Sequence, residues 1–383
     1  MVRMKRILIN AFSARLGGGK TYIINLLKHL PEGYDVTILV GAYNAADFLP
    51  FKKDNVSFVV KSMSLKNPVI RILWEIFVLP VFLIVHKYDS YFAPGGVLLT
   101  IPVCGVKYTT ALRNMLPFDN RERKRFSYFS FMRFKLWVLK SVYLISYRTA
   151  DRIVFISRYS RDCVCELYPG AEKKSKIIYH GLNDKFRNPK LVDFDLSQLG
   201  LKKNEFYLYV SRLDVYKAQL EIVEEWRNLR DAGFFYPLVL VGETNGQYGQ
   251  KVFEKIKECG LEKMVICTGP IPNDKLPGLY RQARVLVFAS SCECCPNILL
   301  EMMSAGRPVF SSSISPMPEI GGPDVVYFDP YMSGELSSMV ARVEENFAEF
   351  EQKGEVICKR SESFDWDITI SKTLEYVCGN DNI

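Results

Sequence analysis

Histidine is scarce in this chain of 383 residues, with only three copies, and the ten cysteines form no regular framework. Cys292, Cys294 and Cys295 crowd together, and no CxxC pair occurs elsewhere. Because ligands at suitable spacing are missing, a zinc site is not expected. Ten cysteines in a chain of this length also exclude a disulfide scaffold. We expect reduced cysteines that pack as small apolar groups.

Long apolar runs and repeats are missing as well. The N-terminal run MVRMKRILINAF is too short for a signal peptide. The segment 72–85 is apolar, but Glu75 and Pro80 interrupt it. It also falls short of the ~20 residues that a membrane-spanning helix needs. With 48% hydrophobic and 24% charged residues, we expect an ordinary globular protein without a transmembrane segment.

What the chain does contain is an alternation of short, apolar, strand-like runs with helix-like segments. This alternation is typical of parallel sheets in doubly wound α/β domains. Since 383 residues exceed one typical core, we expect two Rossmann-like domains, 1–185 and 186–363, facing each other across a cleft. The predicted strands are 6–12, 35–40, 56–60, 90–93, 108–112, 152–156 and 176–179 in the first domain, and 206–210, 238–241, 265–268, 285–288, 308–311 and 325–328 in the second.

Charge is distributed unevenly along the chain. The net charge of +8 combines +18 over residues 1–190 with −10 over residues 191–383. Residues 121–148 hold eight lysines and arginines against one glutamate, with eight aromatic residues. If this segment is one helix, a stripe of cations recurs along it at Arg125, Arg133, Lys140 and Arg148. The pattern is typical of an interfacial helix on an anionic membrane, although a core helix with solvated cations also fits. No RNA-binding motif accompanies it, so nucleic acid is not expected.

Two glutamates flank a predicted helix start in the second domain. Glu293 and Glu301 stand with seven residues between them, after a strand-like run. Pro296 suits the first helical position, and Gly306 suits the position that closes a helix. Helix N-terminal amides attract phosphate, and carboxylates accept hydrogen bonds from hydroxyls. A diphosphate between two polyols, as in a nucleotide sugar, would fit; two solvated glutamates are the alternative.

Two cations follow the first strand of the second domain. Arg212 and Lys217 come directly after that strand and precede an amphipathic helix. An arginine fork and a lysine point charge at the carboxyl end of a strand suit a diphosphate. A surface ion pair with Asp214 or Glu221 is the alternative explanation.

A glycine-rich turn follows the first strand of the chain. Gly17, Gly18 and Gly19 lead into a helix and would let a ligand approach the backbone. The segment ARLGGGKT also matches a relaxed Walker A motif, in which Lys20 would contact phosphates and Thr21 would bind Mg²⁺. However, no second strand ends in an aspartate that would hold the metal. A simple packing turn is a third interpretation.

The chain resembles the retaining GT-B glycosyltransferases of glycosyltransferase family 4 nearly from end to end. Glu293 and Glu301 stand at the E-x7-E spacing of that family, and residues 364–377 are similar to its last helix, which crosses back onto the first domain. The resemblance therefore adds 364–383 to the first domain. It is strongest in VSRLDVYK (210–217), in residues 279–309, in PEIGG (318–322) and in VVYFDP (325–330).

The resemblance implies a role for each candidate residue. Arg212 and Lys217 would neutralise the diphosphate leaving group, Glu293 would bind donor-sugar hydroxyls, and Glu301 would hold the ribose diol. Many members carry a histidine near the donor sugar where this chain has Arg113 and Asn114, and Asn114 cannot act as an acid or base. The phosphates would contact Gly17, Gly18, Gly19 and the amides of Asn297, Ile298 and Leu299. The nucleotide base would contact Ile271 in the loop 268–272.

The resemblance also implies an activity. The chain would move a hexose or deoxyhexose, with retention and without metal or cofactor, from a UDP- or GDP-sugar. The acceptor would be a lipid-linked saccharide or polysaccharide in bacterial surface-glycan assembly. The protein would be cytoplasmic and peripheral on the inner face of the plasma membrane, held through 121–148. A Walker-type ATP-binding enzyme or module at the membrane is the alternative, and a non-catalytic scaffold is a third possibility.

Overall fold

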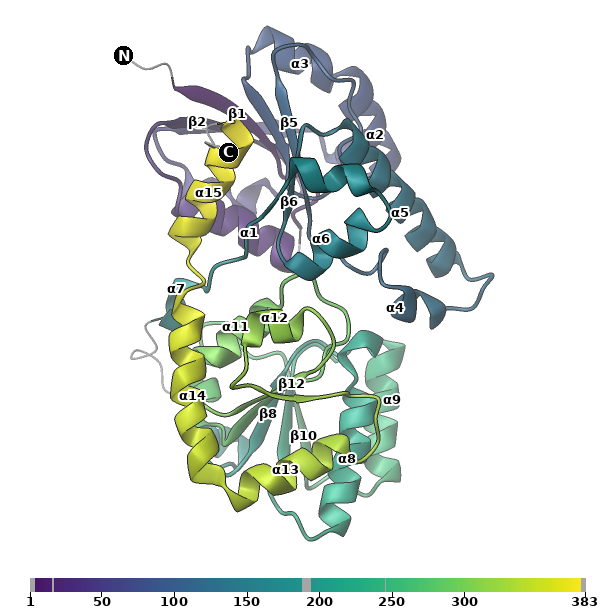
Figure 1. The fold of residues 1–383 in the computed structure, drawn as a ribbon, viewed down its shortest axis with the longest axis vertical. Coiled ribbons are helices and arrows are strands. Elements are labelled where there is room, and N and C mark those ends of the chain that lie inside the picture. The colour runs from purple at the N-terminus through teal and green to yellow at the C-terminus, as the bar shows by residue number, and fades with distance from the viewer. Residues whose placement is uncertain (1–3, 16, 188–193, 245, 380–383) are drawn as a thin grey trace. The chain divides into compact units, whose positions relative to one another are not determined.

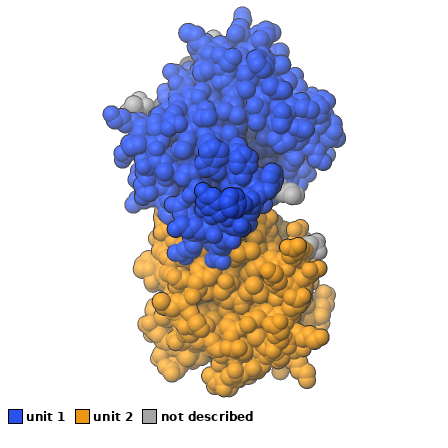
Figure 2. All heavy atoms as spheres, turned by 90° about the vertical axis from the view of Figure 1, so that its right-hand side faces the viewer, with its two compact units in different colours: residues 1–181, 365–383 blue, residues 182–364 orange. Residues whose placement is uncertain are grey.

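The computed structural model describes residues 4–15, 17–187, 194–244 and 246–379 (Figure 1). The chain divides into two compact units, which Figure 2 colours separately. Unit 1 comprises Met1–Gly181 and Asp365–Ile383, and unit 2 comprises Leu182–Phe364.

Unit 1 is built on a seven-stranded sheet of order β3-β2-β1-β4-β5-β6-β7, in which all paired strands are parallel. The neighbours β1 and β4 are not consecutive, so the strand order reverses between them. Ligands of doubly wound sheets bind at such a switch point. The strands are β1 (Lys5–Asn10), β2 (Tyr34–Gly41), β3 (Val56–Lys61), β4 (Ser90–Ala93), β5 (Lys107–Leu112), β6 (Arg152–Phe155) and β7 (Ser175–Ile177).

Helices cover both faces of this sheet. The connections from β3 to β4 and from β5 to β6 run in the same direction across the sheet, opposite to the connection from β1 to β2. Right-handed crossovers therefore put α2, α3 and α5 on one face and α1 on the other. The helices are α1 (Gly17–Lys28), α2 (Pro68–Phe77), α3 (Leu79–Val85), α4 (Asn120–Lys124), α5 (Phe131–Thr149), α6 (Arg158–Cys165) and α15 (Trp366–Cys378).

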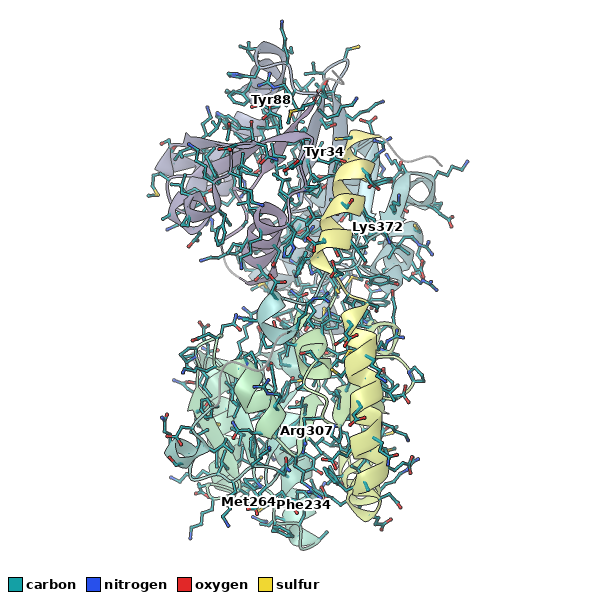
Figure 3. The ribbon with its side chains drawn as sticks, turned by 90° about the vertical axis from the view of Figure 1, so that its left-hand side faces the viewer. Tyr34, Tyr88, Phe234, Met264, Arg307 and Lys372 are labelled. Carbon is teal, nitrogen blue, oxygen red and sulfur yellow. The ribbon has the colours of Figure 1, made fainter. Side chains whose placement is uncertain are left out.

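The C-terminal helix α15 packs in unit 1, as the sequence predicted. Trp366, Ile370 and Leu374 are buried in the core formed by β1, β2 and α1. Tyr34, at the start of β2, also packs against this cluster, and Figure 3 shows it beside α15. The last helix is therefore part of the core of the first domain rather than an appendage of the second.

Unit 2 is a second parallel sheet, of order β10-β9-β8-β11-β12-β13, with its switch point between β8 and β11. Its strands are β8 (Tyr207–Val210), β9 (Leu238–Val241), β10 (Val265–Gly269), β11 (Val285–Phe288), β12 (Val309–Ser312) and β13 (Val326–Phe328). Its helices are α7 (Asp184–Arg187), α8 (Gln219–Asp231), α9 (Gln247–Glu258), α10 (Leu276–Gln282), α11 (Asn297–Met303), α12 (Met317–Gly321), α13 (Glu335–Glu345) and α14 (Phe347–Glu362).

Every predicted strand is present in this structure, and the fold class is confirmed. The short apolar runs fold as strands because helices bury both faces of each sheet. The prediction of a single helix over 121–148 is wrong. The segment forms two helices, because Ser130 caps the N-terminus of α5 and separates it from α4. Among the described helices, none alone is long and apolar enough to cross a membrane. Helices α2 and α3, which meet at a bend of 44°, are together long and apolar enough for a membrane span, by length and composition only.

Candidate functional site

The switch point of unit 2 brings three of the predicted residues together. Strands β8 and β11 are parallel neighbours that end at Val210 and Phe288. The loops that follow these strands carry Arg212 and Lys217 on one side and Glu293 on the other. Because carboxyl ends of parallel strands share one edge of a sheet, residues 76 positions apart meet here.

Lys217 and Glu293 form a shielded ion pair. The Lys217 ammonium donates to Glu293 Oε1 at 2.5 Å, and both side chains are largely buried. Ser290 Oγ donates to the same carboxylate oxygen at 2.8 Å. The Lys217 ammonium also lies 5.1 Å from the centre of the Phe288 ring, within the range of a cation–π contact. The second oxygen, Glu293 Oε2, has no hydrogen-bond partner among the residues that the structure describes.

The loop that presents Lys217 is fixed from both ends. Tyr209, at the end of β8, donates its hydroxyl to the Lys217 carbonyl at 2.6 Å. Gln219 donates to Ser211 Oγ at 2.8 Å. Between them Ala218 adopts a left-handed backbone conformation, with a φ of 55°. This conformation costs an alanine about 1 kcal/mol, so the surrounding contacts must impose it.

Arg212 is held more loosely than Lys217. Its side chain is 59% exposed, and it donates to Asp214 Oδ2 at 2.8 Å and to the Tyr216 hydroxyl at 3.0 Å. The surface ion pair with Asp214 that the sequence offered as an alternative is therefore present. An exposed pair of this kind contributes about 0–1 kcal/mol, so an incoming diphosphate could displace it at little cost.

Glu301 occupies a less polar environment than Glu293. It lies in the middle of α11, and the carboxyl is shielded from solvent. Burial raises its pKa to about 7, although Lys185 and a hydrogen bond with Asn183 act in the opposite direction. It lies beside Tyr280, whose buried hydroxyl has no partner among the described residues, in a pocket without room for a water-sized group. A ligand hydroxyl would have to displace side chains to reach the Glu301 carboxylate.

The N-terminus of α11 differs by one position from the prediction. Pro296 is the N-cap residue, and the helix begins at Asn297. The N-cap residue Pro296 provides no side-chain cap, so the amides of Ile298 and Leu299 are candidates for an anion. Gly306 follows the helix with a φ of 67°, as expected for a closing glycine. Ile271 follows the edge strand β10, which β9 separates from β8.

The glycine turn of unit 1 opens α1. Gly17 to Gly19 form its first turn, and Gly17 has a φ of 59°. Lys20 does not point into an empty phosphate cradle, because its ammonium pairs with Asp47 Oδ1 at 2.6 Å. Thr21 Oγ1 donates back to the Gly17 carbonyl at 3.3 Å. The two side chains that a Walker site needs are therefore already engaged within unit 1.

The place of the family histidine is taken by two residues that point apart. Asn114 is exposed, and its Oδ1 accepts a hydrogen bond from the Leu116 amide at 3.2 Å. Arg113 donates to the Pro94 carbonyl at 2.9 Å and to His180 Nε2 at 2.8 Å. An arginine only donates, so His180 accepts at Nε2 and carries its proton on Nδ1. A role of Asn114 on the donor sugar stays a prediction.

Comparison with known families accounts for most of the chain. Residues 16–186 match the model described as "Glycosyltransferase Family 4", and residues 193–354 match the one described as "Glycosyl transferases group 1". The chain belongs to the family 4 type of glycosyltransferases. The two matched ranges correspond to the two Rossmann-like units, with the switch-point residues Arg212, Lys217 and Glu293 in the second.

Curated relatives of this glycosyltransferase are distant. An uncharacterized glycosyltransferase of Methanocaldococcus jannaschii is 27% identical over 188 residues, 46% of each chain. The serotype-specific mannosyltransferase WbdA of Escherichia coli is 22% identical over 301 residues, which is 75% of this chain and 35% of WbdA. The chain thus spans about half the length of the first relative and about a third of the second.

Solved structures share the fold over the whole length. A glycosyltransferase from Rickettsia africae has a TM-score of 0.76 at 17% identity, with both chains covered completely. Anabaena Alr3699/HepE in complex with UDP-glucose has a TM-score of 0.73 at 17% identity, with 98% of this chain and all of HepE covered. At this identity the likeness establishes the GT-B fold and no more.

Several residues of the enzyme's site were not predicted from the sequence. Ser290, Tyr216 and Gln219 hold Glu293, Arg212 and the connecting loop, as described above. Serine, tyrosine and glutamine carry no charge pattern, and their partners lie on other elements. Only their position directly beyond a strand end could have indicated them.

Proposed function

We propose that the glycosyltransferase moves a hexose, with mannose as the first candidate, from a UDP- or GDP-sugar onto a lipid-linked saccharide or polysaccharide in bacterial surface-glycan assembly. The observation that carries this proposal is the grouping of Arg212, Lys217 and Glu293 at the switch point of unit 2. Mannose comes first because WbdA is named a mannosyltransferase, and a nucleotide sugar because HepE binds UDP-glucose.

The grouping suits the charge changes of the reaction. When the glycosidic bond to phosphate breaks, the leaving nucleoside diphosphate gains negative charge. Lys217 and Arg212 supply fixed cations for that charge, and the uncapped amides of α11 add partial positive charge. Glu293 Oε2 accepts from a sugar hydroxyl, and Glu301 accepts from the ribose diol. In this proposal the enzyme needs no metal, and the product keeps the anomeric configuration of the donor.

A panel of sugar nucleotides tests the proposal. We expect GDP-mannose, UDP-glucose or UDP-galactose to be hydrolysed slowly alone and transferred when a saccharide acceptor is added, with equal rates in EDTA. NMR of the product should show the donor's anomeric configuration. Absence of turnover with every donor would contradict the function, and loss of activity in EDTA would contradict the metal-free mechanism.

Arg212 gives the clearest test of the site. Because its side chain is exposed, Arg212→Ala should change the free energy of unfolding by less than about 0.5 kcal/mol. It should weaken nucleoside diphosphate binding about tenfold or more, since a hydrogen bond to a charged group contributes about 1.5–3 kcal/mol. Arg227→Ala is the matched control, because Arg227 is an exposed arginine paired with Glu224 on the same unit. Equal affinities of the two variants would contradict the assignment.

We further propose that unit 1 binds an anionic membrane surface, so that the enzyme works on the cytoplasmic face of the plasma membrane. The exposed side of α5 is mainly apolar, with Trp137 58% exposed and Phe131 and Phe134 beside it along the helix, and it also carries the exposed cations Lys135 and Arg148. Within the predicted stripe of cations, Arg133 and Lys140 are partly buried, whereas Arg125 and Arg148 are exposed. An apolar face with cations at its margins suits the boundary between headgroups and acyl chains.

Helices α2 and α3 enlarge this surface on the same face of the sheet. Their exposed residues include Val69, Leu73, Phe77, Val81 and Val85. Co-sedimentation with vesicles of phosphatidylglycerol and phosphatidylethanolamine should lose at least tenfold in affinity on Trp137→Glu, since burying such a side chain contributes about 1.5–3 kcal/mol. The control Phe253→Glu alters an exposed aromatic of unit 2. Equal binding of both variants would contradict this surface.

A further inference from the structure

A small polar cavity lies at the switch point of the sheet in unit 1. Strands β1 and β4 are parallel neighbours there and end at Asn10 and Ala93. The space open to the centre of a water-sized group is about 20 Å³, which holds one such group. The residues around it come from these strand ends, the following loops and α2: Asn10, Ser13, Ala93, Gly95 and Val97, with Arg71 and Glu75.

Glu75 is the unusual member of this lining. It is 3% exposed, although α2 otherwise presents apolar side chains to the surface. Its Oε1 accepts from Asn10 Nδ2 at 2.8 Å, and Arg71 Nε lies 3.9 Å from the same oxygen. Its Oε2 has no hydrogen-bond partner in the described part of the chain.

The Asn10 side chain cannot supply that partner. Asn10 uses its second amide proton on the Tyr91 hydroxyl at 2.8 Å, and its Oδ1 accepts from the Phe12 amide at 3.0 Å. Burial raises the pKa of Glu75 against the influence of Arg71 and Asn10. Glu75 lines the cavity, so a hydrogen-bond donor that enters it can reach a carboxyl oxygen of a side chain that is otherwise buried.

We propose that this cavity is an acceptor subsite in which Glu75 Oε2 accepts a hydrogen bond from one hydroxyl of the acceptor saccharide. The size of the cavity limits the entering group to about one heavy atom. Glu75 disfavours an anion there, and Arg71 disfavours a cation, which leaves a neutral donor. The subsite rests on the proposed transferase function, and the exposed apolar side of the same helix α2 suits an acceptor with a lipid portion.

A double-mutant cycle between enzyme and acceptor tests the subsite. The acceptors are octyl α-D-mannoside and its 2-, 3-, 4- and 6-deoxy analogues, with the donor found in the panel above. Glu75→Gln should lower kcat/KM for the parent acceptor by about tenfold to a hundredfold, while hydrolysis of the donor by water stays unchanged. With the wild-type enzyme, one deoxy analogue should have a kcat/KM lower than that of the parent acceptor by a similar factor. For that analogue, Glu75→Gln should lower kcat/KM no further.

Two further variants separate binding from stability. Gly95→Ala would place a methyl group 2.2 Å from Ser13 Oγ, which narrows the cavity and leaves the carboxyl group in place. It should show the same acceptor-specific loss. Glu225→Gln removes a buried carboxylate that accepts from the Gly334 and Ser337 amides in unit 2. It should lower Tm without changing the ranking of the acceptors.

Different results overturn different statements. If every deoxy analogue lowers kcat/KM by the same factor in wild type and in Glu75→Gln, the cavity holds only water and the subsite is refuted. If Glu75→Gln loses donor hydrolysis and transfer together, Glu75 acts only in folding. If the wild-type enzyme neither hydrolyses nor transfers from any donor, the proposed function fails first, and the subsite fails with it.

Discussion

Replacing Glu301 by glutamine should change how the stability of the glycosyltransferase depends on pH. Burial in unit 2 raises the pKa of the Glu301 carboxyl from its ordinary value of 4.5 to about 7. Below pH 4.5 the folded and unfolded chains both hold the proton. Between pH 4.5 and 7 the unfolded chain has released the proton and the folded chain still binds it, so rising pH favours unfolding. Above pH 7 the penalty is complete.

The size of this effect follows from the two pKa values. A pKa that rises from 4.5 to about 7 corresponds to about 3 kcal/mol of unfolding free energy, lost as the pH rises through that window. Glutamine keeps the shape of the side chain and cannot titrate. The free energy of unfolding of Glu301→Gln, relative to wild type, should therefore rise by about 3 kcal/mol between pH 4.5 and pH 8, whatever the difference between the two proteins at low pH.

Urea titrations followed by circular dichroism at pH 5, 6, 7 and 8 measure this difference. Glu258→Gln on α9 is the control, because Glu258 is exposed and its variant should run parallel to wild type. Parallel curves for Glu301→Gln and wild type would refute the reasoning. Nucleotide binding gives a second readout. If the ribose diol donates to ionised Glu301, wild-type affinity for UDP or GDP should fall up to tenfold per pH unit below pH 7.

Four further substitutions have definite expected outcomes. Lys217→Met and Glu293→Gln should each cost about 3 kcal/mol in urea titrations, because each leaves a shielded partner alone, and the double variant should cost less than their sum. Lys20→Ala breaks a partly buried pair with Asp47 and should leave thermal shifts by UDP and ATP unchanged; loss of an ATP shift would favour the Walker interpretation. Gly242→Ala would place a methyl group 2.0 Å from a backbone carbonyl of the loop after β8 at a φ of 152°, so we expect at least about 2 kcal/mol of destabilisation and weaker nucleotide binding; an unchanged Tm would contradict this.

The fold was predictable because its signal is local. Each strand is a short apolar run bounded by polar turns, so these runs predict parallel α/β sheets even though they do not give the order of the strands. The error over 121–148 has an equally local cause. Counting cations at helical spacing assumes an unbroken helix, but Ser130 caps α5 at its Arg133 amide and ends that continuity. The exposed face of α5 is therefore set by residues after Ser130, and it is mainly apolar, with Lys135 and Arg148 as its exposed cations.

The candidate donor site was predictable only in part. Arg212, Lys217 and Glu293 lie directly beyond strand ends, where ligand-binding residues of such sheets gather, so the positions alone indicate them. The pairing of Lys217 with Glu293 could not be read from the sequence, because it depends on which strands are neighbours. This pairing changes the experiment. Glu293→Ala would leave the shielded Lys217 without its carboxylate partner and destabilise the protein, whereas Arg212→Ala removes an exposed group.

The two switch points share one arrangement of a carboxylate. In unit 2 one oxygen of Glu293 is held by Lys217, and the other has no partner among the described residues. In unit 1 one oxygen of Glu75 is held by Asn10, and the other is likewise without a described partner. A carboxylate fixed through one oxygen presents the other in a defined direction, which suits recognition of a single hydroxyl. The sequence indicated Glu293 because a motif surrounds it. It concealed Glu75, whose partner lies 65 residues away and whose apolar neighbours suggested only an interrupted hydrophobic segment.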